Sequence, residues 1–386
     1  MSGSCDVVVV GGGPAGLYAA LRLAKSGHSV RLVEEHSVVG EPVHCTGVLA
    51  RDAFNAFGLG TGSILNELTR VRFYSPAGVS VEHETPTVEA VVIDRVRFDQ
   101  ELAAAAAAQG AILHRGRVSA IDIDEDGVTV SCADRSIRAR TCALACGASY
   151  GLQRRLGLGM PRLLLQSAQA ELPAAHAGAV EVHFGADAAP GGFAWAVPVE
   201  RAEGRFVRIG VMCDADAHRH FRRMVELLGA RWGLSAGRCH PRQKVLPLGP
   251  IDRTYGDRLL VLGDAAGLVK PTTGGGIYYS LLSAGIAAEV LGPALNRDRL
   301  GADTLAAYES AWRKAIGSEL RWQAILRRIA QRLDDADIEG LFELARTDGL
   351  MPIVRRTATF NRHREFIVAL LKHPPARRVL FRAALA

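Results

Sequence analysis

The residues from Cys5 to Glu34 constrain the fold more than any other part of the chain. An apolar run over 7–10 leads into Gly-Gly-Gly-Pro-Ala-Gly at 11–16, a helical pattern follows, and a second apolar run ends at Glu34. A buried parallel strand that turns through glycines into a helix, with an acidic residue roughly 20 residues further on, is typical of a dinucleotide site. The pattern therefore predicts a Rossmann-like α/β domain.

Each residue type in this turn has a physical task. Gly11 can adopt the positive φ of a tight turn, Gly13 has no Cβ to hold a pyrophosphate away, and Gly16 lets the helix pack closely on the strand. Glu34 can accept hydrogen bonds from an adenosine ribose and would repel a 2′-phosphate, which favours FAD or NAD over NADP. The residues expected to bind the cofactor here are Gly11, Gly13, Pro14, Ala15, Gly16, Glu34 and Glu35.

Length and composition exclude several classes of protein. With 386 residues, of which 48% are hydrophobic and 22% charged, the chain can bury a substantial core in two joined lobes. No stretch reaches about 18 uninterrupted apolar residues, and 1–6 lacks a basic signal region, so we expect a cytoplasmic protein. The seven cysteines form no CxxC pair, which favours reduced thiols over disulfides or a zinc site. We expect no metal and no nucleic-acid partner, although the net charge is +6.

The hydrophobic patterns divide the chain into three interleaved regions. Residues 1–68, 94–158 and 252–300 are expected to form a discontinuous nucleotide-binding domain. Alternating patterns over 69–93 and 159–251 predict an antiparallel substrate-binding sheet, with one helical insertion near 219–232. Residues 301–386 are expected to be helical, with breaks at Pro352 and at Pro374-Pro375, and a helical pattern is also expected over 49–57.

A second glycine turn identifies the cofactor. A buried run over 258–262 ends in Gly263-Asp264, and Thr-Gly-Gly-Gly-Ile at 273–277 opens a long apolar helix. One nucleotide needs one glycine turn, whereas an extended dinucleotide with a polyol and a ring can use two. Asp264 can accept from ribitol hydroxyls, and the helix N-terminus favours the negative edge of a reduced flavin. We therefore predict FAD, held in this second turn by Gly263, Asp264, Gly274, Gly275, Gly276 and Ile277.

These motifs resemble two nested families of FAD proteins. The glycine turn at 11–16, Glu34, Arg95 in Asp-Arg-Val-Arg-Phe-Asp, Cys-Gly-Ala at 146–148 and Gly263-Asp264 resemble the para-hydroxybenzoate hydroxylase superfamily. Three patterns, at 42–47, 192–198 and 269–279, more closely resemble the geranylgeranyl reductase family. The resemblance covers about residues 5–330. It implies that reduced FAD delivers hydride to carbon-carbon double bonds of a prenyl chain, within isoprenoid lipid biosynthesis, and that Arg95 contacts FAD.

The resemblance also assigns roles around the flavin. Cys45 matches a cysteine that the family places beside the flavin, where a thiol can hold and release a proton. Two roles remain possible for Lys270: it supplies positive charge near a diphosphate or near reduced flavin, or its side chain is solvated. Two roles also remain possible for His44, which either tunes the Cys45 thiol or is structural. We expect Cys45, Trp195 and Tyr278 to be catalytic, with Cys45 also contacting FAD, and Phe193, Trp195, Pro198 and Tyr279 to bind the substrate. The alternatives are a space-filling role for Cys45, core packing for Phe193, Trp195 and Pro198, and a place in the helix interface for Tyr278 and Tyr279.

One departure from the superfamily leaves the electron donor open. Cys146 stands where Asp is common, which weakens the case for NADPH docking in the hydroxylase manner, although Arg154 and Arg155 follow. NAD(P)H, ferredoxin and a quinol remain alternatives, as do the head group of the prenyl substrate, the number of bonds reduced and the oligomeric state.

Two other functions and a membrane contact are also predicted as alternatives. An FAD monooxygenase or halogenase would share the cofactor residues, although the halogenase WxWxIP strand is matched only loosely at 193–198. A non-enzymatic flavin-binding or membrane-scaffold protein is disfavoured because pocket residues accompany the cofactor residues. The arginine-rich, apolar tail predicts peripheral contact of the C-terminal helices with a membrane, or else a helical lid over the sheet.

Overall fold

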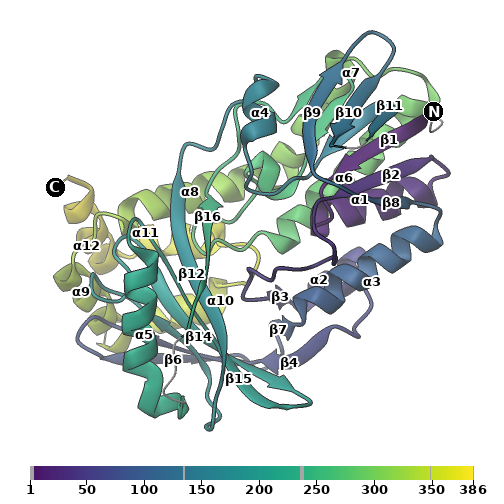
Figure 1. Cartoon of the computed structure of the whole chain (residues 1–386). Helices are drawn as coiled ribbons and strands as arrows, with labels where there is room; N and C mark the ends of the chain where they lie inside the picture. The colour runs from purple at the N-terminus through teal and green to yellow at the C-terminus, as the bar shows by residue number, and fades with distance from the viewer. Residues whose placement is uncertain (1–3, 134, 235–238, 348, 386) are drawn as a thin grey trace.

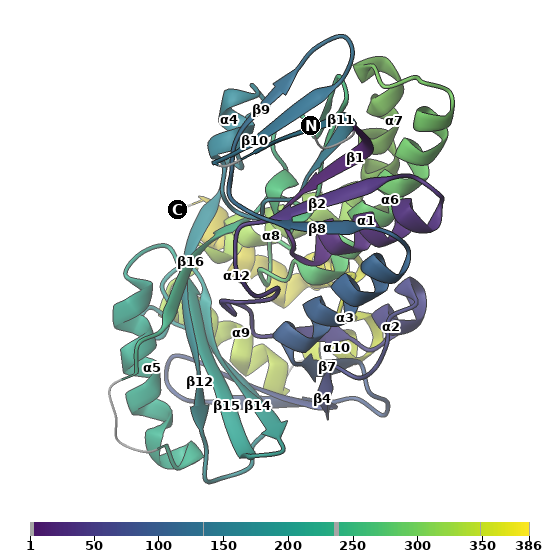
Figure 2. The same ribbon diagram turned by 45° about the vertical axis from the view of Figure 1, so that its right-hand side comes forward.

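The computed structural model describes residues 4–133, 135–234, 239–347 and 349–385. A first lobe that the sequence predicts to bind a nucleotide (called the nucleotide-binding lobe below), a second lobe built on an antiparallel sheet, and a set of C-terminal helices make up the fold (Figure 1). The mixed α/β fold class expected from the sequence is confirmed. The turned view in Figure 2 shows the C-terminal helices beside both lobes.

The nucleotide-binding lobe is organised by an eight-stranded sheet. Its central strand β1 pairs in parallel with β2 and β11, so the apolar run after Cys5 is buried on both faces. The helices α1 (Pro14–Lys25), α3 (Arg95–Ala108) and α6 (Ile277–Asn296) pack together beside it. The strands of this sheet are β1 (Cys5–Val10), β2 (Val30–Glu34), β8 (Ile112–Arg115), β9 (Val118–Ile123), β10 (Val128–Cys132), β11 (Ser136–Leu144), β17 (Tyr255–Gly256) and β18 (Leu259–Val261).

The second lobe is a seven-stranded sheet in the order β16-β12-β15-β14-β13-β5-β6, antiparallel except at β13–β5. The amphipathic helix α5 (Ala217–Trp232) covers one face and buries Phe221, Met224, Leu228 and Trp232. Its strands are β5 (Arg70–Tyr74), β6 (Ser80–Glu84), β12 (Leu164–Pro173), β13 (Val180–His183), β14 (Phe193–Arg201), β15 (Gly204–Cys213) and β16 (Arg242–Pro247).

A small three-stranded sheet lies between these parts, in the order β3-β7-β4, with bounds Val48–Ala50, Ala90–Ile93 and Ile64–Leu68. The helical pattern expected over 49–57 is therefore wrong at its start, because Leu49 and Ala50 are buried in β3 and the helix α2 begins only at Asp52. Of the segment 69–93, β5 and β6 join the seven-stranded sheet, whereas β7 pairs with β3 and β4.

The C-terminal region is helical as expected. Pro352 lies in the first turn of α10 and Pro374 begins α12, positions where the missing amide hydrogen costs no helical bond. Of the described helices, α6 alone is long and apolar enough to cross a membrane, but 67% of its apolar window is buried inside the fold. The remaining helices are α2 (Asp52–Phe57), α4 (Gly151–Arg155), α7 (Ala302–Trp312), α8 (Ser318–Ala330), α9 (Asp335–Thr347), α10 (Leu350–Thr357), α11 (Arg364–Lys372) and α12 (Pro374–Leu385).

Candidate functional site

A central cavity of about 690 Å³ lies where the two lobes and the C-terminal helices meet. Its walls come from both glycine turns, the loop that carries Cys45, the face of the seven-stranded sheet, and α8 and α9. The predicted site residues that line it are Pro14, Ala15, Cys45, Arg95, Phe193, Trp195, Asp264, Gly274, Gly275, Gly276, Ile277 and Tyr278. The structure thus brings together predicted residues that lie up to 264 positions apart in the sequence, from Pro14 to Tyr278.

The first glycine turn has the geometry of a phosphate cradle. Gly11 has φ of 108°, and a Cβ there would lie 2.3 Å from the carbonyl oxygen of Ala145. A Cβ on Gly16 would lie 1.9 Å from the Gly11 oxygen, so the start of α1 touches the strand backbone. At Gly13, which caps α1, a Cβ would meet nothing within 4 Å. The turn is closed where packing needs glycine and open where a phosphate would approach.

Glu34 lies beside this turn at the end of β2. Its Oε2 accepts from the amide of Gly12 at 2.6 Å, its Oε1 accepts from the amide of His36 at 2.9 Å, and the side chain is 11% exposed. The ring Nδ1 of His36 also lies 2.6 Å from Oε1. These contacts fix the carboxylate in one orientation and leave Oε2 able to accept from a ribose. Glu35 is exposed and pairs with Arg117 at 3.5 Å, outside the cavity lining.

The second turn presents an unpaired acid to the cavity. Asp264 lies in a 3₁₀ turn over Gly263–Ala266, and burial, opposed by Lys244 and Arg95, raises the pKa of its carboxyl. Its side chain is only partly buried, and no hydrogen bond within the described ranges reaches the carboxylate oxygens; the Tyr150 hydroxyl donates to the backbone carbonyl instead. A carboxylate that lines the cavity can accept from the hydroxyl groups that FAD carries. Together with the open cradle at Gly13, this acid fits the residues to FAD.

Cys45 lies in the loop before β3 and faces the cavity. Its Sγ accepts from the amide of Gly47 at 3.3 Å, and the guanidinium of Arg95 also interacts with the thiol. Arg95 pairs with Asp99 at 2.6 Å, while its Nε is buried without a partner. Arg95, which lines the cavity, therefore links the Cys45 thiol to the buried carboxylate of Asp99.

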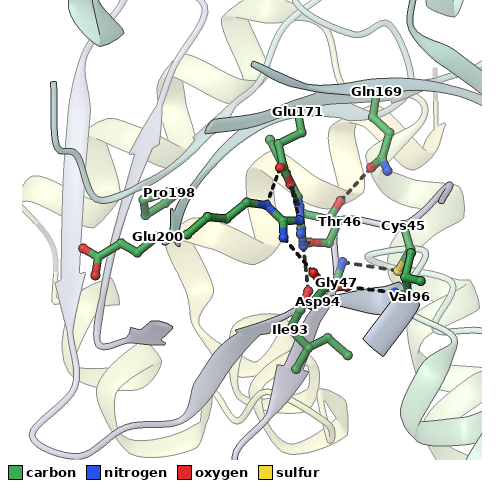
Figure 3. A network of polar contacts seen from close by, with 12 residues as sticks. Cys45, Thr46, Gly47, Ile93, Asp94, Val96, Gln169, Glu171, Pro198 and Glu200 are labelled. Atoms are coloured by element: carbon green, nitrogen blue, oxygen red, sulfur yellow. Dashed lines mark hydrogen bonds and ion pairs between the residues drawn. The ribbon is translucent and has the colours of Figure 1, made fainter. Parts of the chain in front are cut away.

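A buried ion network holds the Cys45 loop in place (Figure 3). Arg208 of β15, which is 3% exposed, donates to the carbonyl oxygens of Thr46 and Ile93 at 2.6 and 3.0 Å, and to Glu171 at 2.7 Å. A Cβ on Gly47 would lie 2.5 Å from this guanidinium, so the loop requires glycine there. Sequence reasoning missed Arg208.

The same network reaches the helix that carries Arg95. The Arg201 guanidinium donates to the carboxylate of Glu171 at 2.7 Å and to that of Asp94 at 2.6 Å. Asp94 caps α3 by accepting from the amides of Val96 and Arg97. Cys45 and Arg95 are therefore positioned by a common set of ion pairs from the seven-stranded sheet.

His44 contacts β16 as well as the cavity. Its Nε2 lies 3.2 Å from the carbonyl oxygen of Arg242, and burial, then Lys244, lowers the pKa of the ring. A neutral imidazole in this position donates to that carbonyl and ties the Cys45 loop to the second lobe.

Aromatic side chains extend the cavity away from the glycine turns. Phe193 and Trp195 project from β14 with ring centroids 5.8 Å apart, and Phe184 lies 6.2 Å from Phe193 and 6.1 Å from Phe342 of α9. Leu333, Ile338 and Leu341 complete this apolar arm between the sheet and the C-terminal helices. The Trp195 indole lies against Gly210, where a Cβ would be 2.2 Å from its Cζ2.

Two predicted substrate residues lie outside the cavity. The carbonyl of Pro198 accepts from Asn66 at 3.3 Å on the β4 side of the sheet. Tyr279 is 1% exposed, and its hydroxyl donates to the carbonyl of Asn361 at 3.2 Å. Tyr278, its neighbour on α6, does face the cavity.

Gly147 lines the cavity beside the first turn, and its neighbour Cys146 lies outside the lining. Gly147 has φ of 64° and a Cβ there would meet nothing within 4 Å, which leaves open space at the cavity wall. Burial raises the pKa of Cys146 to about 11, and its Sγ contacts Gln153 at 3.4 Å. This position therefore carries a neutral thiol instead of an acid.

Comparison with known proteins identifies the family. The family model for lycopene cyclase protein matches residues 6–172. The chain is 33% identical over 364 residues to digeranylgeranylglycerophospholipid reductase 2 of Methanothermobacter thermautotrophicus, covering 87% of this chain and 90% of the relative. It is 29% identical to the digeranylgeranylglycerophospholipid reductase of Methanocaldococcus jannaschii, covering 88% and 90%.

Solved structures share the fold. A geranylgeranyl bacteriochlorophyll reductase-like protein from Thermoplasma acidophilum has a TM-score of 0.85 at 22% identity, covering 98% of this chain and 99% of that one. The flavin-dependent brominase Bmp2 has a TM-score of 0.73 at 16% identity, covering 99% and 98%. Structural likeness at these identities establishes the fold alone. The sequence identity to the reductases named above extends over most of the chain and therefore identifies the family. The chain belongs to the geranylgeranyl reductase family of FAD-dependent proteins.

Proposed function

We propose that this protein is an FAD-dependent oxidoreductase that reduces carbon-carbon double bonds of a polyprenyl chain carried on a lipid, a diphosphate or a quinone. The observation that carries the proposal is the apolar arm, which leads from the glycine turns between the sheet and α9. Bound FAD, once reduced, supplies the hydride. The relatives named digeranylgeranylglycerophospholipid reductase support a glycerolipid as the carrier.

The chain's own residues orient the substrate and supply the proton. Phe193 and Trp195 form the wall that a prenyl chain would lie against, and Phe342 closes the far side of the arm. Removing water from an apolar arm strengthens the electrostatic interactions made inside it. The Sγ of Cys45 carries the proton and interacts with Arg95. We assign Cys45 the role of general acid.

The direct test uses anaerobic protein reduced with dithionite. We expect products from geranylgeranyl diphosphate, a prenylated quinone or a digeranylgeranylated glycerolipid whose masses rise in steps of two hydrogens. Incorporation of oxygen under air, with no gain of hydrogen, would instead identify the protein as a monooxygenase. Bleaching of the flavin absorbance by NADH, NADPH, reduced ferredoxin or a quinol identifies the electron donor in the same apparatus.

A substitution at the end of the arm tests where the chain lies. Phe342→Trp enlarges a side chain that is 8% exposed, so it should reduce turnover of a geranylgeranyl substrate at least about tenfold more than that of a geranyl substrate. Phe381→Trp is the matched control because Phe381 is 50% exposed. Equal losses for long and short chains would place the substrate elsewhere.

We also propose that the C-terminal helices contact an anionic membrane. Exposed arginines at 355, 356, 377 and 378 and the exposed Phe381 favour an interfacial contact, whereas Ile367 and Leu370 of α11 are buried inside the fold.

Flotation with anionic liposomes tests this contact. Reversing the charge of Arg377 and Arg378 to Glu should reduce co-flotation at least about fivefold, without loss of FAD. Reversal of Arg162 and Arg253, which lie in other parts of the fold, is the control. Equal flotation of both variants would contradict the proposal.

A further inference from the structure

Lys270 begins the second flavin turn and its side chain lies alongside that turn. Its amide donates to the carbonyl of Gly275 at 3.1 Å, and its carbonyl accepts from the amide of Gly274 at 2.9 Å. A Cβ on Gly275 would lie 3.6 Å from Lys270 Cδ. Lys270 is 3% exposed and lines the central cavity. The amine is therefore within one side-chain length of the helix N-terminus that faces the flavin site.

The contacts of Lys270 are with neutral groups, and no carboxylate of the described residues forms an ion pair with it. Nζ donates to the carbonyl of Phe360 at 2.7 Å and to Asn361 Oδ1 at 2.9 Å, and it lies 4.4 Å from the centroid of the Phe360 ring. A neutral amine has two N–H bonds, and both have acceptors here. An ammonium has a third N–H, for which the described residues offer only the face of the Phe360 ring, and none of their carboxylates lies within 4.0 Å of Nζ.

The charged groups around Lys270 are few. Burial lowers the pKa of Lys270 to about 7, opposed by Asp52 of α2 and Glu319 of α8. His363 at the start of α11 has its pKa lowered to about 4 by burial and then by Lys270, so it is neutral near pH 7. Tyr278 and Tyr279 of α6 have their pKa values raised by burial and remain protonated, and Arg362 is exposed.

We propose that Lys270 takes up a proton when bound FAD is reduced, so that a new ammonium group balances the charge added beside the second glycine turn. Two electrons from the reductant and one proton go to the ring, and a second proton from solvent binds the Lys270 amine. Added negative charge nearby favours the protonated amine, and the protonated amine in turn favours the reduced cofactor. This inference goes beyond the proposed function, since it holds for any substrate.

Proton uptake during anaerobic reduction tests the inference directly. At pH 8, in weak buffer with a pH-indicator dye, and after subtraction of the protons that the dithionite reductant itself releases, we expect an uptake of about two protons per FAD for the native protein and about one for Lys270→Met. Lys270→Arg, which is always charged, should also take up about one proton while keeping a cation at this position. Lys372→Met on the surface of α11 is the control and should behave as the native protein.

The pH dependence of the FAD midpoint potential is the second measurement. A tenfold change in proton concentration shifts the potential of a two-electron couple by about 30 mV for each proton taken up. The native protein should therefore show twice the slope of both Lys270 variants near pH 8. The absorbance of the reduced flavin reports whether the ring itself carries the second proton. Equal uptake by native protein and Lys270→Met, or a second proton found on the ring, would overturn the inference, whether or not prenyl substrates are reduced.

Discussion

Cys45→Ala should lower turnover of the prenyl substrate by about 100-fold or more, because it removes a general acid that faces the cavity. Reduction of the flavin by its electron donor should be unchanged, since the proton is needed only when the double bond is reduced. Single-turnover kinetics separate the two steps: the reduced flavin of Cys45→Ala should persist in the presence of substrate, whereas that of the native protein should reoxidise.

Two further variants distinguish the thiol from its surroundings. Cys239→Ala removes a cysteine outside the cavity lining and should leave turnover unchanged. Arg208→Met removes the side chain that holds the loop through Thr46, so it should lower turnover through misplacement of Cys45 and should also reduce thermal stability. Unchanged turnover in Cys45→Ala at full FAD content would exclude the thiol as the proton donor.

Gly16→Ala should prevent the nucleotide-binding lobe from folding normally. Its Cβ would lie 1.9 Å from the oxygen of Gly11, which is backbone and cannot move aside, so a loss of about 3 kcal/mol or more in the free energy of unfolding is expected. Gly13→Ala should act differently because its Cβ meets no protein atom within 4 Å. The flavin-free variant should fold normally, whereas its affinity for FAD should fall roughly 100-fold.

The measurements are thermal unfolding of the flavin-free proteins and titration with FAD. Gly229→Ala in the last turn of α5 is the matched control: its Cβ also meets nothing within 4 Å, and alanine there should be neutral or stabilise by up to about 0.5–1 kcal/mol. If Gly13→Ala bound FAD as tightly as the native protein, the pyrophosphate could not lie against this turn.

The parts of the fold and site that the sequence predicted are those set by local chemistry. The turn at Gly11 and Gly16 follows from steric needs within a few residues, and the open approach at Gly13 follows from the same logic. Asp264 and the helix after it could be recognised because the second turn repeats the strand, glycine and helix order. The family resemblance predicted that Phe193 and Trp195 would line the cavity.

The side-chain periodicity of strands and helices could have corrected some of the predicted site positions, but not all of them. Phe193, Trp195 and Val197 line the cavity, so strand alternation places Pro198 on the opposite face. Adjacent positions on a helix point about 100° apart, which lets Tyr278 and not Tyr279 face the cavity. Arg208 binds the Cys45 loop across a separation of 162 residues, and no local signal reports such a pairing.

The wall that Phe360 and Asn361 contribute has a consequence for biosynthesis. Asn361 Nδ2 donates to Asp52 Oδ1 at 3.3 Å across a separation of 309 residues, and Lys270 bonds to both tail residues. Domains generally fold as they leave the ribosome, N-terminal parts first. The wall of the central cavity is therefore complete only after Asn361 has left the ribosome, so we expect an emerging polypeptide to gain its affinity for a coenzyme only from that point on.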